Sequence, residues 1–140
     1  MTHRQLLQEV WGYEIVTVPD TAVAAQLQKA RADEGVVKEA QRRADELLAQ
    51  PNVTLGTEKR FVVNSFLALH VFRQIMREHG ATNLGVANCM GSLIKLLDTP
   101  PCLVLSLLND EGLTAFCHVD MTHTAPGVLL RWISGKPSFV

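Results

Sequence analysis

The chain has 140 residues, of which 47% are hydrophobic and 19% charged, and its formal net charge at pH 7 is −1. This length fits one domain with a hydrophobic core, and the near-neutral charge gives no reason to expect binding to nucleic acid or to a membrane surface. The three cysteines lack C-x-x-C spacing, which disfavours a disulfide framework, and no apolar stretch is long enough to cross a bilayer. We therefore expect a single domain over residues 1–140 in the cytoplasm.

Apolar periodicity predicts a series of helices separated by short strands. The predicted helices comprise one ending near residue 12, one over residues 21–32, and others over 36–50, 58–79, 92–98, 102–109 and 126–133. The predicted strands cover residues 13–18, 83–89, 113–117 and 138–140. Helices that alternate with strands are typical of parallel sheets, so we predict a three-layer α/β fold with a mostly parallel sheet of about four strands and helices on both faces.

Polar side chains gather directly after the strand predicted at residues 113–117. His118 and Asp120 are two positions apart and share one face of an extended chain, where an imidazole and a carboxylate can bind a divalent metal or transfer a proton. His123 follows, and Asn88 ends the neighbouring strand. Because parallel strands end at the same edge of a sheet, we expect Asn88 to lie close to His118 and Asp120. A simpler interpretation, in which Asp120 only caps the next helix, stays open.

Other polar residues have structural interpretations. Cys89 and Cys117 end predicted strands and are expected to be small apolar fillers rather than catalytic nucleophiles. His70 lies on the margin of the wide apolar stripe of the helix over residues 58–79, so we expect a hydrogen-bonded histidine at the core boundary.

The sequence of residues 101–140, PCLVLSLLNDEGLTAFCHVDMTHTAPGVLLRWISGKPSFV, resembles a segment of the L-fucose/L-arabinose isomerase family. In that family a cysteine and a helix precede Asn-Asp-x-Gly, a strand ending in Cys-Glu-x-Asp, a helix, and Gly-x-Pro with a further strand. The most specific blocks here are residues 117–120 and 135–137, and GYEIVTVPDTAVA is similar to a strand and turn of the family's second α/β domain. The resemblance implies a piece of a larger isomerase-like protein.

This resemblance implies metal-dependent aldose–ketose isomerisation in the complete protein and a role in carbohydrate metabolism. The family's glutamate in Cys-Glu-x-Asp binds a divalent metal, usually manganese, and helps to move a proton between C1 and C2 of the sugar. Here His118 stands at that position and Asp120 matches the aspartate. We therefore assign catalysis and Mn²⁺ binding to His118 and Asp120, and substrate binding to Asn88 and His123.

The remaining metal ligands of that family would lie beyond residue 140, so we expect the chain by itself to be inactive. Two alternatives stay open beside the isomerase. The chain could belong to a non-catalytic sugar-binding or interaction relative in which His118 replaces the catalytic glutamate, or to an unrelated α/β binding domain. The expected partners are a monosaccharide and, in the full-length protein, further copies of the same chain.

Overall fold

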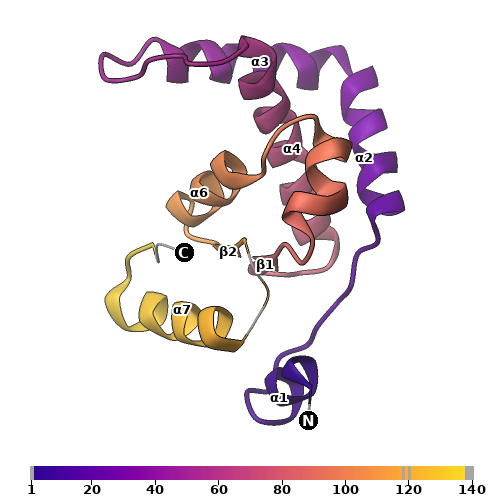
Figure 1. The fold of residues 1–140 in the computed structure, drawn as a ribbon, viewed down its shortest axis with the longest axis vertical. Coiled ribbons are helices and arrows are strands. Elements are labelled where there is room, and N and C mark those ends of the chain that lie inside the picture. Colours follow the sequence, from indigo (N-terminus) through magenta and orange to yellow (C-terminus); the bar gives the residue numbers. More distant parts are fainter. Residues whose placement is uncertain (1, 118, 120, 138–140) are drawn as a thin grey trace.

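The computed structural model describes residues 2–117, 119 and 121–137, and for residues 3 and 121–123 it describes the backbone alone. Helices account for 64% of the structure, and a single two-stranded parallel sheet lies among them in the described part of the chain (Figure 1). The predicted three-layer α/β fold with a sheet of about four strands is therefore wrong. The protein is mainly helical, with a small parallel pair.

The elements follow one another along the whole sequence, and most are helices. In chain order they are α1 (His3–Glu9), α2 (Asp20–Ala32), α3 (Glu34–Leu48), α4 (Lys59–Glu78), β1 (Asn83–Gly85), the π-helix η1 (Cys89–Leu93), α5 (Ile94–Leu97), α6 (Cys102–Asp110), β2 (Thr114–Phe116) and α7 (Met121–Ser134).

Helix α4 forms the centre of the fold, in contact with α2, α3, α5 and α6. Its apolar residues lie on more than one face of the helix, and Leu69 and Val71 are completely buried. A helix with so wide an apolar surface is stable only when neighbours cover it on several sides. The predicted buried helix over residues 58–79 is therefore confirmed, with bounds that differ by one residue at each end.

The strand predicted over residues 13–18 is absent. This segment is extended but has no regular hydrogen-bonded partner, and it leads from α1, which lies beside α7, to α2 in the helical body (Figure 1). The Arg4 guanidinium donates hydrogen bonds to Thr17 Oγ1 (2.8 Å) and to the carbonyl oxygen of Ile15 (3.1 Å). Alternating side chains favour extended backbone, but a strand also needs a neighbouring strand edge.

The other predicted strands are shorter than expected or lie outside the described residues. Strands β1 and β2 have three residues each, in parallel register with Leu84 opposite Ala115. The strand predicted over residues 138–140 lies outside the described residues. On the other edge of β2, the Asn109 side chain accepts a hydrogen bond from Ala115 N (3.1 Å) and donates one to Ala115 O (2.9 Å). Asn109 thus occupies the place where a further strand would pair.

Two predicted helices begin three or more residues earlier than expected. Helix α7 starts at Met121 and contains Pro126, although the prediction began the helix at this proline. A proline near a helix start removes only one internal hydrogen bond, so the preceding residues can still be helical. The helix predicted over residues 92–98 begins as a π-helix at Cys89, where the Asn88 side chain occupies the space that a Cβ on Gly91 would fill.

No single helix in the described part of the chain has the length and apolar composition to cross a membrane. Two consecutive segments, Cys89–Leu97 and Cys102–Asp110, reach that length and composition only together and meet at 88°. Both contribute to the hydrophobic core, through Leu97 and Leu108 among others.

Candidate functional site at the β1/β2 edge

The carboxyl ends of β1 and β2 meet at one edge of the parallel pair, which we call the β1/β2 edge. The ladder continues past the strands through a hydrogen bond from Val86 N to the carbonyl oxygen of Phe116 (3.0 Å). The expectation that these two strands end side by side is confirmed. In open parallel sheets, such an edge is where ligands usually bind.

Close packing holds the segment after β2 against the end of β1. The Val119 side chain lies so near Gly85, the last residue of β1, that a Cβ at Gly85 would overlap with its Cγ2 atom. A residue other than glycine at position 85 would therefore push this segment away. The sequence shows Gly85 in the predicted strand, but it does not show which side chain the glycine accommodates.

The predicted site residues differ in how far the structure describes them. His118 and Asp120 lie outside the described residues, and His123 belongs to the first turn of α7 with only its backbone described. Asn88 is exposed, directly precedes η1, and donates a hydrogen bond from its amide nitrogen to Ser92 Oγ (3.4 Å). The proximity of Asn88 to His118 and Asp120 thus stays a prediction.

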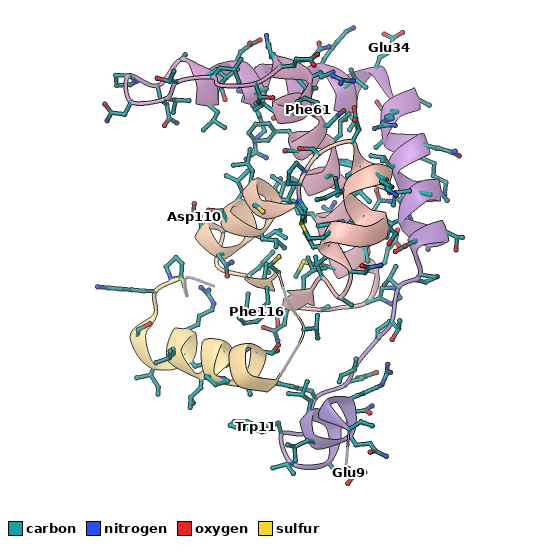
Figure 2. All side chains as sticks on the ribbon, in the orientation of Figure 1. Glu9, Trp11, Glu34, Phe61, Asp110 and Phe116 are labelled. Carbon is teal, nitrogen blue, oxygen red and sulfur yellow. The ribbon has the colours of Figure 1, made fainter. Side chains whose placement is uncertain are left out.

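Helix α7, which contacts β2, contains Thr124, a residue that the sequence analysis did not select. Its hydroxyl oxygen is buried and has no hydrogen-bond partner in the part of the chain that the structure describes. One turn later, Gly127 packs on Phe116, whose Cε1 would lie 2.5 Å from an added Cβ (Figure 2 shows Phe116 between the strands and α7). Buried hydroxyls are normally hydrogen-bonded, so the Thr124 hydroxyl differs from the other buried polar groups of the described residues. Sequence alone cannot show that a threonine hydroxyl lacks a partner.

The Cys89 thiol, at the start of η1, is not suited to catalysis. Burial raises the pKa of the Cys89 thiol to about 11, and a hydrogen bond with Cys117 together with the nearby Cys117 and Cys102 adds to the increase. All three cysteines are present as thiols. A protonated thiol is a poor nucleophile and a poor metal ligand, which agrees with the interpretation of Cys89 as a small apolar filler.

The described residues do not contain a ready metal site. No group of three or more histidine, cysteine, aspartate or glutamate side chains within them is placed to hold an ion. Asn88 and Thr124 supply neutral donors and acceptors, whereas Mn²⁺ prefers carboxylate oxygens and imidazoles. Binding of Mn²⁺ by His118 and Asp120 therefore stays a prediction.

Comparisons of this chain with protein-family models, curated proteins and solved structures gave no match.

Proposed function

We propose that this chain is part of a protein related to the L-fucose/L-arabinose isomerases and that its β1/β2 edge contributes to a monosaccharide-binding site. The observation that carries this proposal is the meeting of the two parallel strand ends. The sequence block that resembles the isomerases, residues 117–120, directly follows β2 at this edge.

The polar groups near the strand ends suit a sugar. A monosaccharide presents hydroxyl groups that both donate and accept hydrogen bonds, and it carries no charge. The Asn88 amide and the Thr124 hydroxyl each offer a donor and an acceptor, and the Thr124 hydroxyl is unpaired within the described residues. Buried neutral donors and acceptors left unpaired cost free energy, which a ligand hydroxyl would recover.

In the catalytic form of this proposal, the chain's own residues handle the proton. His118 would take a proton from C2 of an aldose and return it to C1 of the ene-diol, while the C2 hydroxyl loses its proton and the C1 oxygen gains one, since an imidazole exchanges protons near neutral pH. Asp120 would orient the imidazole or the sugar by accepting a hydrogen bond. Together, His118 and Asp120 would hold a divalent metal, which by resemblance is manganese and which would polarise the sugar oxygens.

A second candidate function is sugar binding without catalysis. It is favoured by His118, which stands where the resembled family has a glutamate. The replacement removes a negative charge that would balance the metal, so metal binding should weaken.

Sugar binding can be tested by titrating the 140-residue chain with L-fucose and L-arabinose and following backbone amide NMR shifts. We expect shifts in residues 85–92 and 121–125, and Asn88→Ala and Thr124→Val should each weaken binding by about 2–10-fold, the value of one neutral hydrogen bond. Asn52→Ala is the control, because Asn52 is exposed in a loop and is distant in sequence from both of these segments. Shifts confined to other segments would contradict the proposed site.

Catalysis is tested separately by incubating the chain with Mn²⁺ and a panel of aldoses and measuring ketose. We expect no ketose from the unmodified 140-residue chain. Ketose formed by that chain would favour the catalytic form. Ketose formed only by a lengthened chain that carries His118→Glu would favour the non-catalytic relative.

A further inference from the structure

A hollow of about 280 Å³ lies between α3 and α4. Neither helix is part of the β1/β2 edge. Val36, Ala40 and Phe66 form the apolar floor of the hollow, and Arg43, His70 and Arg73 lie around it. We call it the α3/α4 hollow. A second hollow of about 180 Å³ shares Arg73 and continues toward the end of α4. Because residues three and four positions apart share one helix face, His70, Arg73 and Arg77 form a row along α4.

Two basic side chains at this hollow, Arg43 and His70, make no hydrogen bond or ion pair with the residues that the structure describes. The Arg43 guanidinium lies over the Phe66 ring, 4.9 Å from its centroid, and makes no hydrogen bond or ion pair with any residue that the structure describes. His70 is half-buried and, within the same residues, its side chain has no hydrogen bond. The expected position of His70 at the core boundary agrees with this burial, and its hydrogen bonding stays a prediction. Arg73, by contrast, forms an ion pair with Glu111, with Nε 2.7 Å from Oε2.

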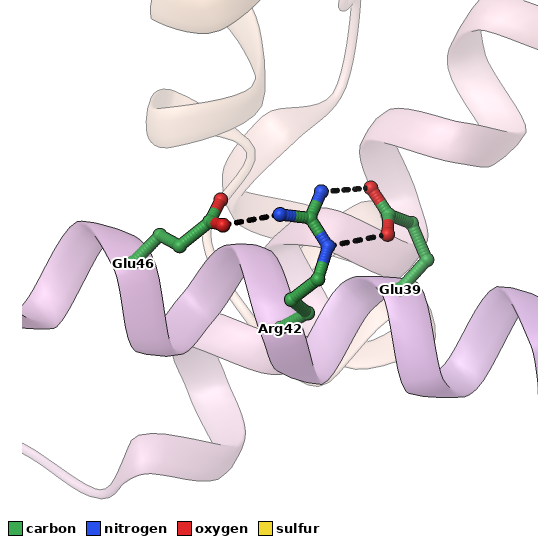
Figure 3. A network of polar contacts seen from close by, with 3 residues as sticks. All are labelled: Glu39, Arg42 and Glu46. Carbon is green, nitrogen blue, oxygen red and sulfur yellow. Dashed lines mark hydrogen bonds and ion pairs between the residues drawn. The ribbon is translucent and has the colours of Figure 1, made fainter.

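Glu39 is the carboxylate that lines the hollow, and its charge is neutralised by Arg42, which does not line it. Glu39 accepts hydrogen bonds from Arg42 Nε (2.8 Å) and Nη2 (2.6 Å), and Arg42 also pairs with Glu46 (Figure 3). The hydrogen bonds from Arg42 hold the pKa of Glu39 below its usual value. Arg43 also attracts Glu39 at longer range. Because Arg43 makes no hydrogen bond with the described residues, its N–H donors stay available for a ligand.

We propose that the α3/α4 hollow binds a small organic anion that carries a phosphate or carboxylate group beside an aromatic or aliphatic part. The Arg43 guanidinium is planar, offers two parallel donors, and is held over the Phe66 ring, so it can bind such an anion in a bidentate manner. The apolar floor of Val36, Ala40 and Phe66 would contact the hydrophobic part of the ligand. This site is independent of the proposed sugar site, so either can fail without the other.

The test is titration of the chain with phenyl phosphate, benzoate and inorganic phosphate, followed by backbone amide NMR. We expect saturable shifts in residues 35–43 and 66–73, with phenyl phosphate or benzoate binding more tightly than inorganic phosphate because only they reach the apolar floor. The comparison of phenyl phosphate with benzoate distinguishes a phosphate ligand from a carboxylate ligand. Arg43→Gln should weaken binding about tenfold, since charge-assisted hydrogen bonds are lost.

Lys38→Gln is the matched control, because it makes the same charge change on α3 at a side chain that does not line the hollow and pairs with Glu34. It should change the affinity less than about twofold. Should Arg43→Gln disturb the helix, as circular dichroism would show, Arg43→Lys provides the same test, since lysine lacks the planar fork. Absence of saturable binding, shifts outside the hollow, or equal weakening by the Lys38 and Arg43 variants would overturn the proposal.

Discussion

The helical body around α4 and the helix α7 have similar apolar composition but bury it to very different extents. In α4, Leu69 and Val71 are 0% exposed, whereas in α7 Trp132 is 83% and Ile133 is 74% exposed. Four helices contact α4, while α7 contacts mainly β2 and α1. The comparison shows that an apolar sequence makes a core only where neighbours cover more than one side of the helix.

The largest expected effect is in the helical body. Leu69→Ala removes a completely buried side chain and leaves a cavity among α4 and its neighbours, so the free energy of unfolding should fall by about 2–5 kcal/mol. Ile133→Ala, at an exposed position of α7, should change it by less than about 0.5 kcal/mol. Urea denaturation of both variants measures the difference, and equal losses would contradict the comparison.

The next effect concerns Asn109, a residue of α6 whose side chain connects this helix to β2. Its side chain makes hydrogen bonds with Leu105 O and with both backbone groups of Ala115. Asn109→Ala leaves the buried N–H and C=O groups of Ala115 unpaired, and we expect a loss of about 2–3 kcal/mol in the same denaturation measurement. Asn52→Ala, in an exposed turn, is the control and should be close to neutral. A neutral Asn109 variant would show that another group can close this edge of β2.

A smaller effect is expected where α7 meets the strands. Gly127→Ala places a methyl group 2.5 Å from Phe116 Cε1, and such overpacking costs about 1–3 kcal/mol. The higher helix propensity of alanine offsets about 1 kcal/mol of this cost. We therefore expect a net destabilisation of about 1 kcal/mol by thermal denaturation. Gly56→Ala, where a Cβ meets no atom within 4 Å, is the control, and a stabilised Gly127 variant would mean that α7 packs loosely on Phe116.

The smallest effect concerns the thiols. The folded protein holds the Cys89 pKa at about 11, above the ordinary 9.0, so folding favours the neutral thiol. The resulting stability is fully present below pH 9 and is lost as the pH rises toward 11. Denaturation across this range should show a decline that is reduced in Cys89→Ala.

Alkylation gives a second test of the burial and the raised pKa of Cys89. Iodoacetamide at pH 8 should modify the exposed Cys102 well before Cys89, as peptide mass spectrometry would show. Rapid modification of Cys89 in the folded protein would contradict both its burial and its raised pKa.

The sequence was a good guide to helices and a poor guide to the sheet. The buried helix over residues 58–79 could be predicted because the spacing of its apolar residues is visible in the local sequence. The core buries the helix faces that this spacing defines. The strand at residues 13–18 could not be excluded, because pairing depends on which edge lies nearby. Nor could the sequence show that Asn109 closes the outer edge of β2 with its side chain.

The sequence predicted the pairing of the two strand ends, whereas the candidate site at these ends stays a prediction. The order of helices and strands predicted that the segments after β1 and β2 would meet, and they do. Asn88 lies at that edge, while the roles of His118, Asp120 and His123 stay predictions. Thr124 was missed because the absence of a hydrogen-bond partner is a property of the packed structure, and the sequence shows only a threonine in a helix.

By itself, the sequence determined where α4 forms and that its wide apolar face is buried, because helical periodicity is set by local backbone geometry. It also determined the parallel direction of β1 and β2, since the segment between them contains helices. Within the residues that the structure describes, only the tertiary structure decided that the sheet has two strands, that Trp132 and Ile133 of α7 stay exposed, and that Arg43 forms no hydrogen bond or ion pair. Each of these depends on which distant segments come into contact, and neither periodicity nor residue type specifies those contacts.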